Sequence, residues 1–191
     1  MASISEGSLP RSTDLTYEDY LQLPENGGTR YEILDGDLAV TPAPLTRHQR
    51  VSRNLGRILD AYVHSRHLGE LFYAPTDVIL AETSVVEPDL LFVVAARASI
   101  ISRRAIEGPP DLMIEILSPT TAKRDRETKL KLYARYGVAH YWILDPDGRW
   151  IELYENDGGS FRRTTRAEGN ATLRCTLFPE LEIRLGEVWA E

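Results

Sequence analysis

Two acidic residues stand in apolar stretches of the sequence, where carboxylates are unusual. Glu115 lies in the middle of residues 111–118 (DLMIEILS), and Asp89 follows Pro88 and precedes five apolar residues. Because side chains alternate along a β-strand, a strand that is apolar on both faces is a central one, and we expect Glu115 to be largely buried. Such a carboxylate must be protonated, paired with a cationic side chain or bound to a metal cation.

These acids have the chemistry of a divalent-metal site. If the strands that carry Asp89 and Glu115 pair, the carboxylates can lie side by side, and each would raise the pKa of the other unless a cation keeps both ionised. Glu32, within the apolar run 31–36, is a third candidate. Oxygen ligands without cysteine favour Mg²⁺ or Mn²⁺. Each acid alone also has a structural interpretation: Asp89 as a turn residue, Glu115 as a salt-bridge partner, and Glu32 as part of the fold.

A basic segment follows the Glu115 strand. Asp125, Lys129 and Tyr133 are spaced four residues apart, so they form one row along a predicted helix. We expect Lys129 at the edge of the apolar stripe, with its ammonium reaching inward to orient a water molecule or stabilise a phosphate oxygen. The alternative is a weak surface pair between Asp125 and Lys129.

Further candidates lie in basic stretches. Residues 47–57, 123–131 and 162–166 are rich in arginine or lysine, and Lys123 and Arg124 begin the second of them. They are candidates for contacts with backbone phosphates, although a solvated helix face is the alternative for any single stretch. His48 stands at the start of a predicted helix, where it is either a phosphate-binding or proton-relaying group or a half-buried structural residue.

Composition limits the class of protein. The chain has 191 residues, a formal net charge of −7 and one cysteine, Cys175. An acidic chain is not expected to coat nucleic acid passively, but a bound metal reverses the local charge at a site. No apolar run reaches the roughly 18 residues of a membrane span, and residues 1–14 have no secretory signal pattern. We expect a flexible tail at 1–14, a single domain at 15–191, and a reducing, cytoplasmic location.

The predicted elements alternate between helix and strand. Hydrophobic periodicity and turn signals predict helices at 16–24, 46–67 and 121–136, a hairpin at 30–42, and strands at 70–75, 76–82, 87–94, 111–118, 140–146, 149–156 and 181–185. Mixed strands with two substantial helices predict an α/β or α+β sandwich. There is no Walker A loop, no Rossmann glycine fingerprint and no His-rich metal motif.

Several of these segments carry a family resemblance. RYEILDGDLAV, the His48 helix, VVEPDLLFV, DLMIEILSPTTAKRDRETKLKLYARYGV and HYWILDP resemble, in order and spacing, the Uma2 family (DUF820) of the PD-(D/E)XK nuclease superfamily. The resemblance covers about residues 15–190. It implies an α/β restriction-endonuclease-like core, in which a mixed central β-sheet is flanked by α-helices, and a Mg²⁺-dependent phosphodiesterase site. Asp89 matches the aspartate of the "PD" motif, Glu115 the acid of the second half-motif, and Glu32 the acid of the first segment.

The sequence departs from the superfamily pattern at one catalytic position. The superfamily usually has a lysine two residues after the second acid, and Leu117 stands there. In this family a lysine from the following helix is thought to substitute, and Lys129 is the matching position. A smaller departure is His140, where the resemblance predicts a glutamate.

Two functions from different classes remain. The first is a metal-dependent nuclease that cleaves DNA, in which Asp89 and Glu115 bind Mg²⁺ or Mn²⁺, Glu32 binds it directly or through water, and Lys129 positions or activates water. The second is a non-catalytic binding or assembly module on a nuclease-like scaffold, which the net charge and Leu117 favour. The sequence leaves open DNA versus RNA, and a homodimer through exposed strands is an expectation.

Overall fold

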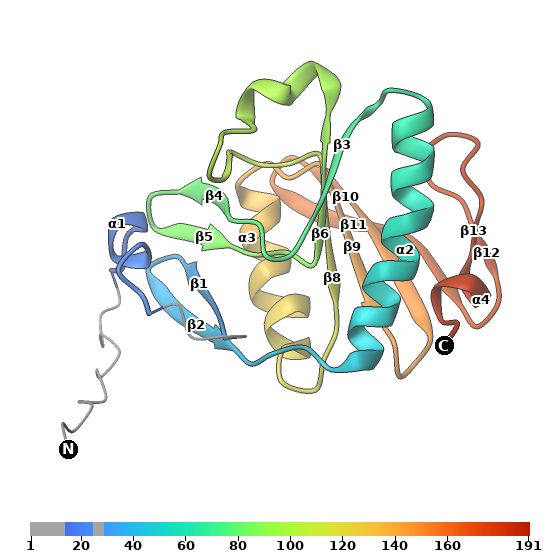
Figure 1. Cartoon of the computed structure of the whole chain (residues 1–191), viewed down its shortest axis with the longest axis horizontal. Coiled ribbons are helices and arrows are strands. Elements are labelled where there is room, and N and C mark those ends of the chain that lie inside the picture. The colour runs from blue at the N-terminus through green and yellow to red at the C-terminus, as the bar shows by residue number, and fades with distance from the viewer. Residues whose placement is uncertain (1–13, 25–28) are drawn as a thin grey trace.

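A mixed six-stranded β-sheet forms the centre of the protein, in a computed structural model that describes residues 14–24 and 29–191 (Figure 1). Its strands are β3 (Gly69–Tyr73), β6 (Leu90–Val94), β8 (Leu112–Ile116), β9 (His140–Asp145), β10 (Trp150–Asp157) and β11 (Ser160–Glu168). The spatial order is β11-β10-β9-β8-β6-β3. Strands β8 and β9 are parallel and the other neighbouring pairs are antiparallel.

A second sheet of five strands packs against the central one. Its strands are β1 (Arg30–Leu34), β2 (Asp37–Thr41), β4 (Val78–Ala81), β5 (Ser84–Val86) and β7 (Ile106–Glu107), in the order β2-β1-β5-β4-β7. Residues 87–89 link β5 to β6, so the chain passes from one sheet to the other within three residues. Strands β12 (Thr172–Leu173) and β13 (Ile183–Arg184) form a small third sheet.

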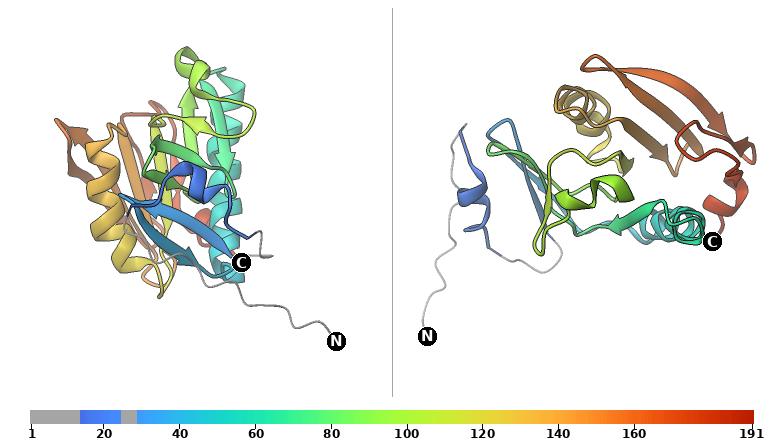
Figure 2. Two further views of the ribbon diagram at one scale, coloured as in Figure 1. Left: turned by 90° about the vertical axis from the view of Figure 1, so that its left-hand side faces the viewer. Right: turned by 90° about the horizontal axis from the view of Figure 1, so that it is seen from above.

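Helices cover both faces of the central sheet (Figure 2). On one face lies α2 (Thr46–Ser65), whose buried residues recur every three or four positions and pack against β6, β8 and β9; they include Val51, Leu55, Leu59, Tyr62 and Val63. On the other face, a π-helical segment, η2 (Arg124–Lys129), continues into α3 (Leu130–Arg135). Leu132 and Tyr133 of α3 pack there with residues of the central sheet and the five-stranded sheet.

Three short helices complete the fold. They are α1 (Tyr17–Tyr20), the 3₁₀ segment η1 (Ala95–Ile100) and α4 (Leu185–Val188). Thr16 begins α1 with a reciprocal cap, in which the Asp19 carboxylate accepts from the Thr16 backbone N–H at 2.9 Å. No helix in the described part of the chain is long and apolar enough to cross a membrane.

One row of residues crosses the central sheet on the face that α3 covers. Glu115 of β8 pairs with Ile143 of β9, and Ile143 pairs with Glu152 of β10. The register of β6 and β8 sets Leu90 opposite Ile114, and its extension by one residue sets Asp89 opposite Glu115. Directly opposed residues have Cβ atoms about 5 Å apart. The strand pairing therefore brings together the two acids that the sequence singled out.

The α/β class and the mixed sheet flanked by helices are confirmed. The structure has two larger sheets where the sequence predicted one central sheet, and β5 was not predicted. The strand predicted at 87–94 begins at Leu90, and the strand predicted at 181–185 forms only the two residues of β13 before α4 begins. The flexible tail predicted for 1–14 lies outside the described residues, except for Asp14.

Candidate active site

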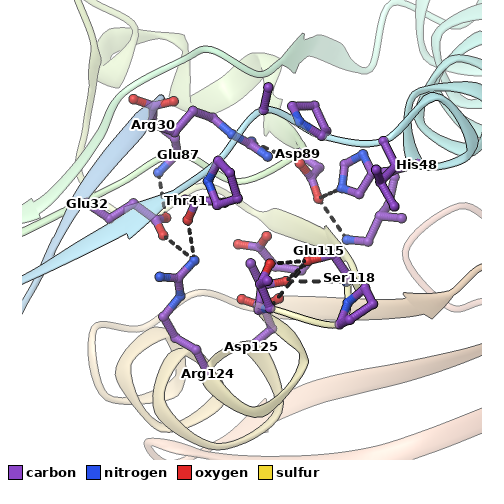
Figure 3. A pocket seen from close by; sticks show the side chains of 18 of the residues that line it. Arg30, Glu32, Thr41, His48, Glu87, Asp89, Glu115, Ser118, Arg124 and Asp125 are labelled. Atoms are coloured by element: carbon purple, nitrogen blue, oxygen red, sulfur yellow. Dashed lines mark hydrogen bonds and ion pairs between the residues drawn. The ribbon is translucent and has the colours of Figure 1, made fainter. Parts of the chain in front are cut away.

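A cavity of about 200 Å³ lies beside residues 87–89, where the chain passes between the two larger sheets (Figure 3). Its ionisable lining consists of Arg30, Glu32, His48, Glu87, Asp89, Glu115, Arg124, Asp125 and Lys129. These residues come from β1, α2, the link before β6, β8 and η2, which are distant in the sequence. The fold therefore gathers charged side chains from five segments into one enclosed space.

Asp89 is held from three directions. Its Oδ1 atom lies 3.0 Å from a guanidinium nitrogen of Arg30, and Oδ2 lies 3.0 Å from Nε2 of His48. The backbone N–H of Ile116 donates to Oδ2 at 2.8 Å. Burial alone would raise the pKa of Asp89, but His48, Arg30 and the backbone donor lower it overall. Asp89 is thus an ionised carboxylate with a fixed orientation.

Glu115 has a different environment, although it lies opposite Asp89. Its Oε1 atom accepts hydrogen bonds from Nζ of Lys129 and from the Tyr133 hydroxyl, both at 2.8 Å. Burial raises the pKa of Glu115 to about 8. Lys129 would lower this pKa, but the nearby acids Asp125, Asp89 and Glu32 raise it and offset the effect of the lysine. The Glu115 carboxylate therefore lacks enough positive charge nearby to stay fully ionised at neutral pH.

Lys129 joins the two sheets through its ammonium group. Its Nζ atom lies 2.7 Å from Oε1 of Glu32, 2.8 Å from Oε1 of Glu115 and 3.7 Å from Oδ1 of Asp125. The residue is 2% exposed. The ammonium reaches inward to the acids, as the sequence predicted, and the alternative of a surface pair with Asp125 was wrong, because both side chains are buried. Burial alone would lower the pKa of Lys129, but the three acids raise it, so the amine is protonated.

Asp125 and Lys129 both lie on the π-helical segment η2. The sequence predicted a regular α-helix over 121–136, whereas Arg124–Lys129 is wound as a π-helix. Such segments widen the turn and often occur at functional sites. Here Asp125 and Lys129 both face inward, while Arg124 reaches the Thr41 hydroxyl and lies 3.6 Å from Oε2 of Glu32.

The cavity has an excess of negative charge. Five carboxylates line it (Glu32, Glu87, Asp89, Glu115 and Asp125), whereas the permanently cationic side chains are three (Arg30, Arg124 and Lys129). Burial raises the pKa of Glu87 to about 6 and also raises the pKa of Asp125. Oε2 of Glu87 and Oδ1 of Asp125 are buried and accept no hydrogen bond. If all five carboxylates were ionised, the lining would carry two more negative than positive charges, which one divalent cation would balance.

The arrangement of oxygens sets the kind of cation site that the cavity can form. Within residues 14–24 and 29–191, no three side chains of His, Cys, Asp or Glu stand close enough to hold a metal ion by themselves. Mg²⁺ is usually bound by one or two carboxylates and completes its shell with water and substrate phosphate. The donor set around Asp89 and Glu115 fits that open type of site rather than a closed protein cage.

Most of the residues singled out by the sequence meet here. Glu32, His48, Asp89, Glu115, Arg124 and Lys129 all line the cavity. Lys123 does not line the cavity and is exposed, so its contact with a backbone phosphate stays a prediction.

Arg30 and Glu87 also line the cavity but were not predicted from the sequence. Arg30 stands two residues before Glu32, and Glu87 stands two residues before Asp89. That spacing places side chains on the same side of an extended chain, so the signal was present.

Comparisons with known proteins agree with this description. Residues 17–186 match the Uma2 family, which is described as "Putative restriction endonuclease". An uncharacterized protein of Synechocystis sp. is 25% identical over 146 residues, which are 75% of this chain and 82% of that protein.

Among solved structures, the chain is similar to a crystal structure from Anabaena variabilis described as "a putative nuclease belonging to DUF820". The TM-score is 0.76 and the identity is 19%, over 92% of this chain and 97% of that one. At this identity the likeness shows a shared fold. Because the family match covers most of the sequence, the chain belongs to the Uma2 family of restriction-endonuclease-like proteins.

Proposed function

We propose that this protein is a divalent-metal-dependent nuclease that hydrolyses phosphodiester bonds in DNA. One observation carries the proposal: Asp89, which directly precedes β6, and Glu115 of the neighbouring strand β8 line the same cavity, and the ammonium of Lys129 is 2.8 Å from Glu115. The family description and the shared fold support a nuclease-like function.

Asp89 and Glu115 would hold Mg²⁺ or Mn²⁺, with Glu32 as a direct or water-mediated ligand. When bound, the metal would polarise the phosphate and lower the pKa of a coordinated water molecule. The cavity lining has five carboxyl groups against three permanently cationic side chains, which supports this assignment. Oxygen donors without cysteine are the ligands that these hard cations prefer.

Arg30 and His48 act as positioning residues for Asp89. They occupy different oxygens of its carboxylate, and the Ile116 N–H fixes the second oxygen further. The carboxylate is therefore oriented before substrate arrives, and a fixed ligand costs little reorganisation during the reaction. Nδ1 of His48 is buried and has no hydrogen-bond partner among the described residues, and Nε2 makes the contact with Asp89.

Lys129 serves as a hydrogen-bond donor and a positive charge. The neighbouring acids raise the pKa of Lys129, which favours water positioning over water activation among the two predicted roles. Glu32 and Glu115 anchor the ammonium at the cavity wall. From there it can donate to an attacking water molecule or to a phosphate oxygen as negative charge develops. Arg124, which is half-buried beside Glu32, is placed to contact a phosphate.

The proposal is tested by cleavage of supercoiled plasmid DNA with Mg²⁺, with Mn²⁺ and with a chelator. We expect cleavage only with a divalent cation, and a loss of at least about a hundredfold in Glu115→Gln, because even residues that merely support metal ligands cost 10–100-fold. Glu127→Gln, an exposed acid on η2, is the matched control. Equal residual activity in wild type and Glu115→Gln would refute the assignment.

The second candidate is a non-catalytic binding module. It is favoured by the existing partners of the acids, since Asp89 is paired with Arg30 and His48, and Glu115 with Lys129. Calorimetry with Mn²⁺ separates the two functions without relying on activity. A nuclease should bind the ion and lose it in Asp89→Asn, whereas a scaffold need bind neither Mg²⁺ nor Mn²⁺.

A further inference from the structure

A second, larger cavity opens beside the candidate active site. It measures about 760 Å³, within the range of about 300–1,000 Å³ that is typical of ligand pockets. It shares Arg30, Pro44, His48, Glu87 and Asp89 with the first cavity. We call the space beyond these shared residues, lined by Gln49, Ser52, Arg53, Arg57, Tyr73, Ala74 and Pro75, the α2 groove. The groove therefore leads outward from Asp89.

One wall of the α2 groove is a polar face of α2. Gln49, Ser52, Arg53 and Arg57 recur at three- or four-residue intervals, so they lie on neighbouring turns of one helix face. Arg53 and Arg57 are exposed, and the Arg57 side chain forms no ion pair with any described residue. Counting the shared residues, the second cavity has three arginines against two acids, the reverse of the balance in the first.

An aromatic ring lies beside this helix face in the α2 groove. Tyr73, at the end of β3, is 41% exposed, which is unusual for a large hydrophobic side chain of this protein. Its ring lies over Gly56 of α2, where an added Cβ atom would come 2.4 Å from Cε1 of Tyr73. The glycine thus leaves room for the ring to lie against the helix, next to the row that contains Arg53 and Arg57.

We propose that the α2 groove binds an unpaired DNA strand that continues from the scissile phosphate, with Arg53 and Arg57 on its phosphates and Tyr73 stacked on a base. Positive groove walls combined with exposed aromatic rings are the usual means of binding single strands. A base in a continuous duplex is already stacked and cannot present its face to Tyr73. The inference rests on the proposed nuclease function and narrows its substrate to DNA with a single-stranded flank.

Binding measurements test the inference separately from cleavage. The probes are a fluorescein-labelled oligodeoxythymidylate and a duplex of the same length, titrated in chelator by fluorescence anisotropy. Tyr73→Ala should weaken single-strand binding by about tenfold and leave duplex binding unchanged. Arg57→Gln should reduce the slope of log Kd against log salt by about 0.7 for the single strand. Arg50→Gln is the matched control, because Arg50 is an exposed arginine of α2 that lines neither cavity.

Gly56→Ala tests the position of the Tyr73 ring without removing the tyrosine side chain. Alanine favours the helix over glycine, yet its Cβ would displace the Tyr73 ring, so the folded protein should bind the single strand more weakly.

The inference is overturned if Tyr73→Ala weakens binding of both probes equally, or if Arg50→Gln and Arg57→Gln change the salt slope alike. If wild type cleaves plasmid DNA but these variants bind as wild type does, the inference alone fails. If wild type does not cleave, the proposed function fails and the binding result stands by itself.

Discussion

Glu115 and Glu152 are buried glutamates on the same face of the central sheet, and their surroundings differ in charge. They lie on β8 and β10, and both pair across β9 with Ile143. Burial and neighbouring acids raise the pKa of Glu115 to about 8, whereas the pKa of Glu152 is lowered. Two residues of the same type, only two strands apart, are therefore stabilised in opposite protonation states.

The difference follows from the number and kind of partners. Glu152 accepts from Arg163 at 2.6 Å, from Arg166 at 2.9 Å and from the Tyr154 hydroxyl at 2.9 Å, with Arg126 at 3.4 Å. Burial alone would raise the pKa of Glu152, but these donors lower it overall. Glu115 shares its one cationic partner, Lys129, with Glu32 and Asp125.

The η2 segment serves both glutamates. It contributes Arg126 to Glu152 and Lys129 to Glu115, so the same turn completes one cluster and leaves the other short of positive charge. A carboxylate with a full set of arginine donors has no need of a metal ion. The comparison indicates that Glu152 belongs to the scaffold, and that Glu115 is where the fold tolerates a deficit of positive charge.

Removal of the Lys129 charge should have the largest effect on stability. Lys129→Met leaves Glu32, Glu115 and Asp125 without their shared cation inside the protein. We expect a loss of about 3–5 kcal/mol in the free energy of unfolding at neutral pH, measured by urea denaturation. Lys131→Met, an exposed lysine two residues along the same helix, should cost less than about 0.5 kcal/mol. Similar losses in the two variants would show that Lys129 does not hold the acids together.

Glu152→Gln should separate stability from activity. The amide cannot match the charge-assisted bonds to Arg163 and Arg166, but these arginines are half-exposed and solvent screens part of the effect. We expect a loss of about 1–2 kcal/mol in the free energy of unfolding, with metal-dependent cleavage unchanged in the folded protein. Glu168→Gln on the neighbouring strand is the control, since that carboxylate is exposed. A loss of cleavage in Glu152→Gln would contradict the scaffold assignment.

Glu115→Gln should show the opposite pattern. The amide keeps the shape of the side chain, and its oxygen can still accept hydrogen bonds from Lys129 and Tyr133. The change also removes one acid from a cavity in which acids outnumber the permanently cationic side chains. We expect the free energy of unfolding to stay within about 1 kcal/mol of wild type, because the loss of a hydrogen-bond acceptor and the relief of repulsion are of similar size. Mn²⁺ binding, followed by calorimetry, should be lost. If Glu115→Gln were strongly destabilised yet still bound Mn²⁺, Glu115 would be part of the scaffold rather than of the metal site.

The sequence was sufficient to predict the acids of the candidate site but not how they are neutralised. Apolar residues on both sides of Glu115 marked a central strand, and the position of Asp89 before an apolar run marked its partner. Local pattern cannot give the register between separate strands, which here decides that the two residues face each other. The same limit applies to Arg30, whose contact with Asp89 joins residues 59 apart in the chain.

The sequence analysis also missed the cluster around Glu152. Glu152 and Arg166 pair across the β10–β11 hairpin, so alternation along the strands could have placed them on one face. Arg126 stands in the basic stretch 123–131, and local sequence cannot show its contact with Glu152, which lies on a separate strand. The π-helical winding of η2 is likewise a property of the packed structure that the regular helix predicted over 121–136 does not include.

Acid sensitivity is the smallest expected effect, and it tests the sign of the difference between the two glutamates. The pKa of Glu152 is lower in the folded protein than its ordinary value, so its contribution to stability is complete above about pH 4.5 and is lost as the pH falls through the folded-state pKa. The advantage of wild type over Glu152→Gln, measured by urea denaturation from pH 7 to pH 3, should therefore shrink toward acid. The opposite result would be a difference in free energy of unfolding between wild type and Glu152→Gln that grows toward acid pH. The arginines around Glu152 would then not be holding it in its ionised form, and burial alone would have to explain the contrast with Glu115.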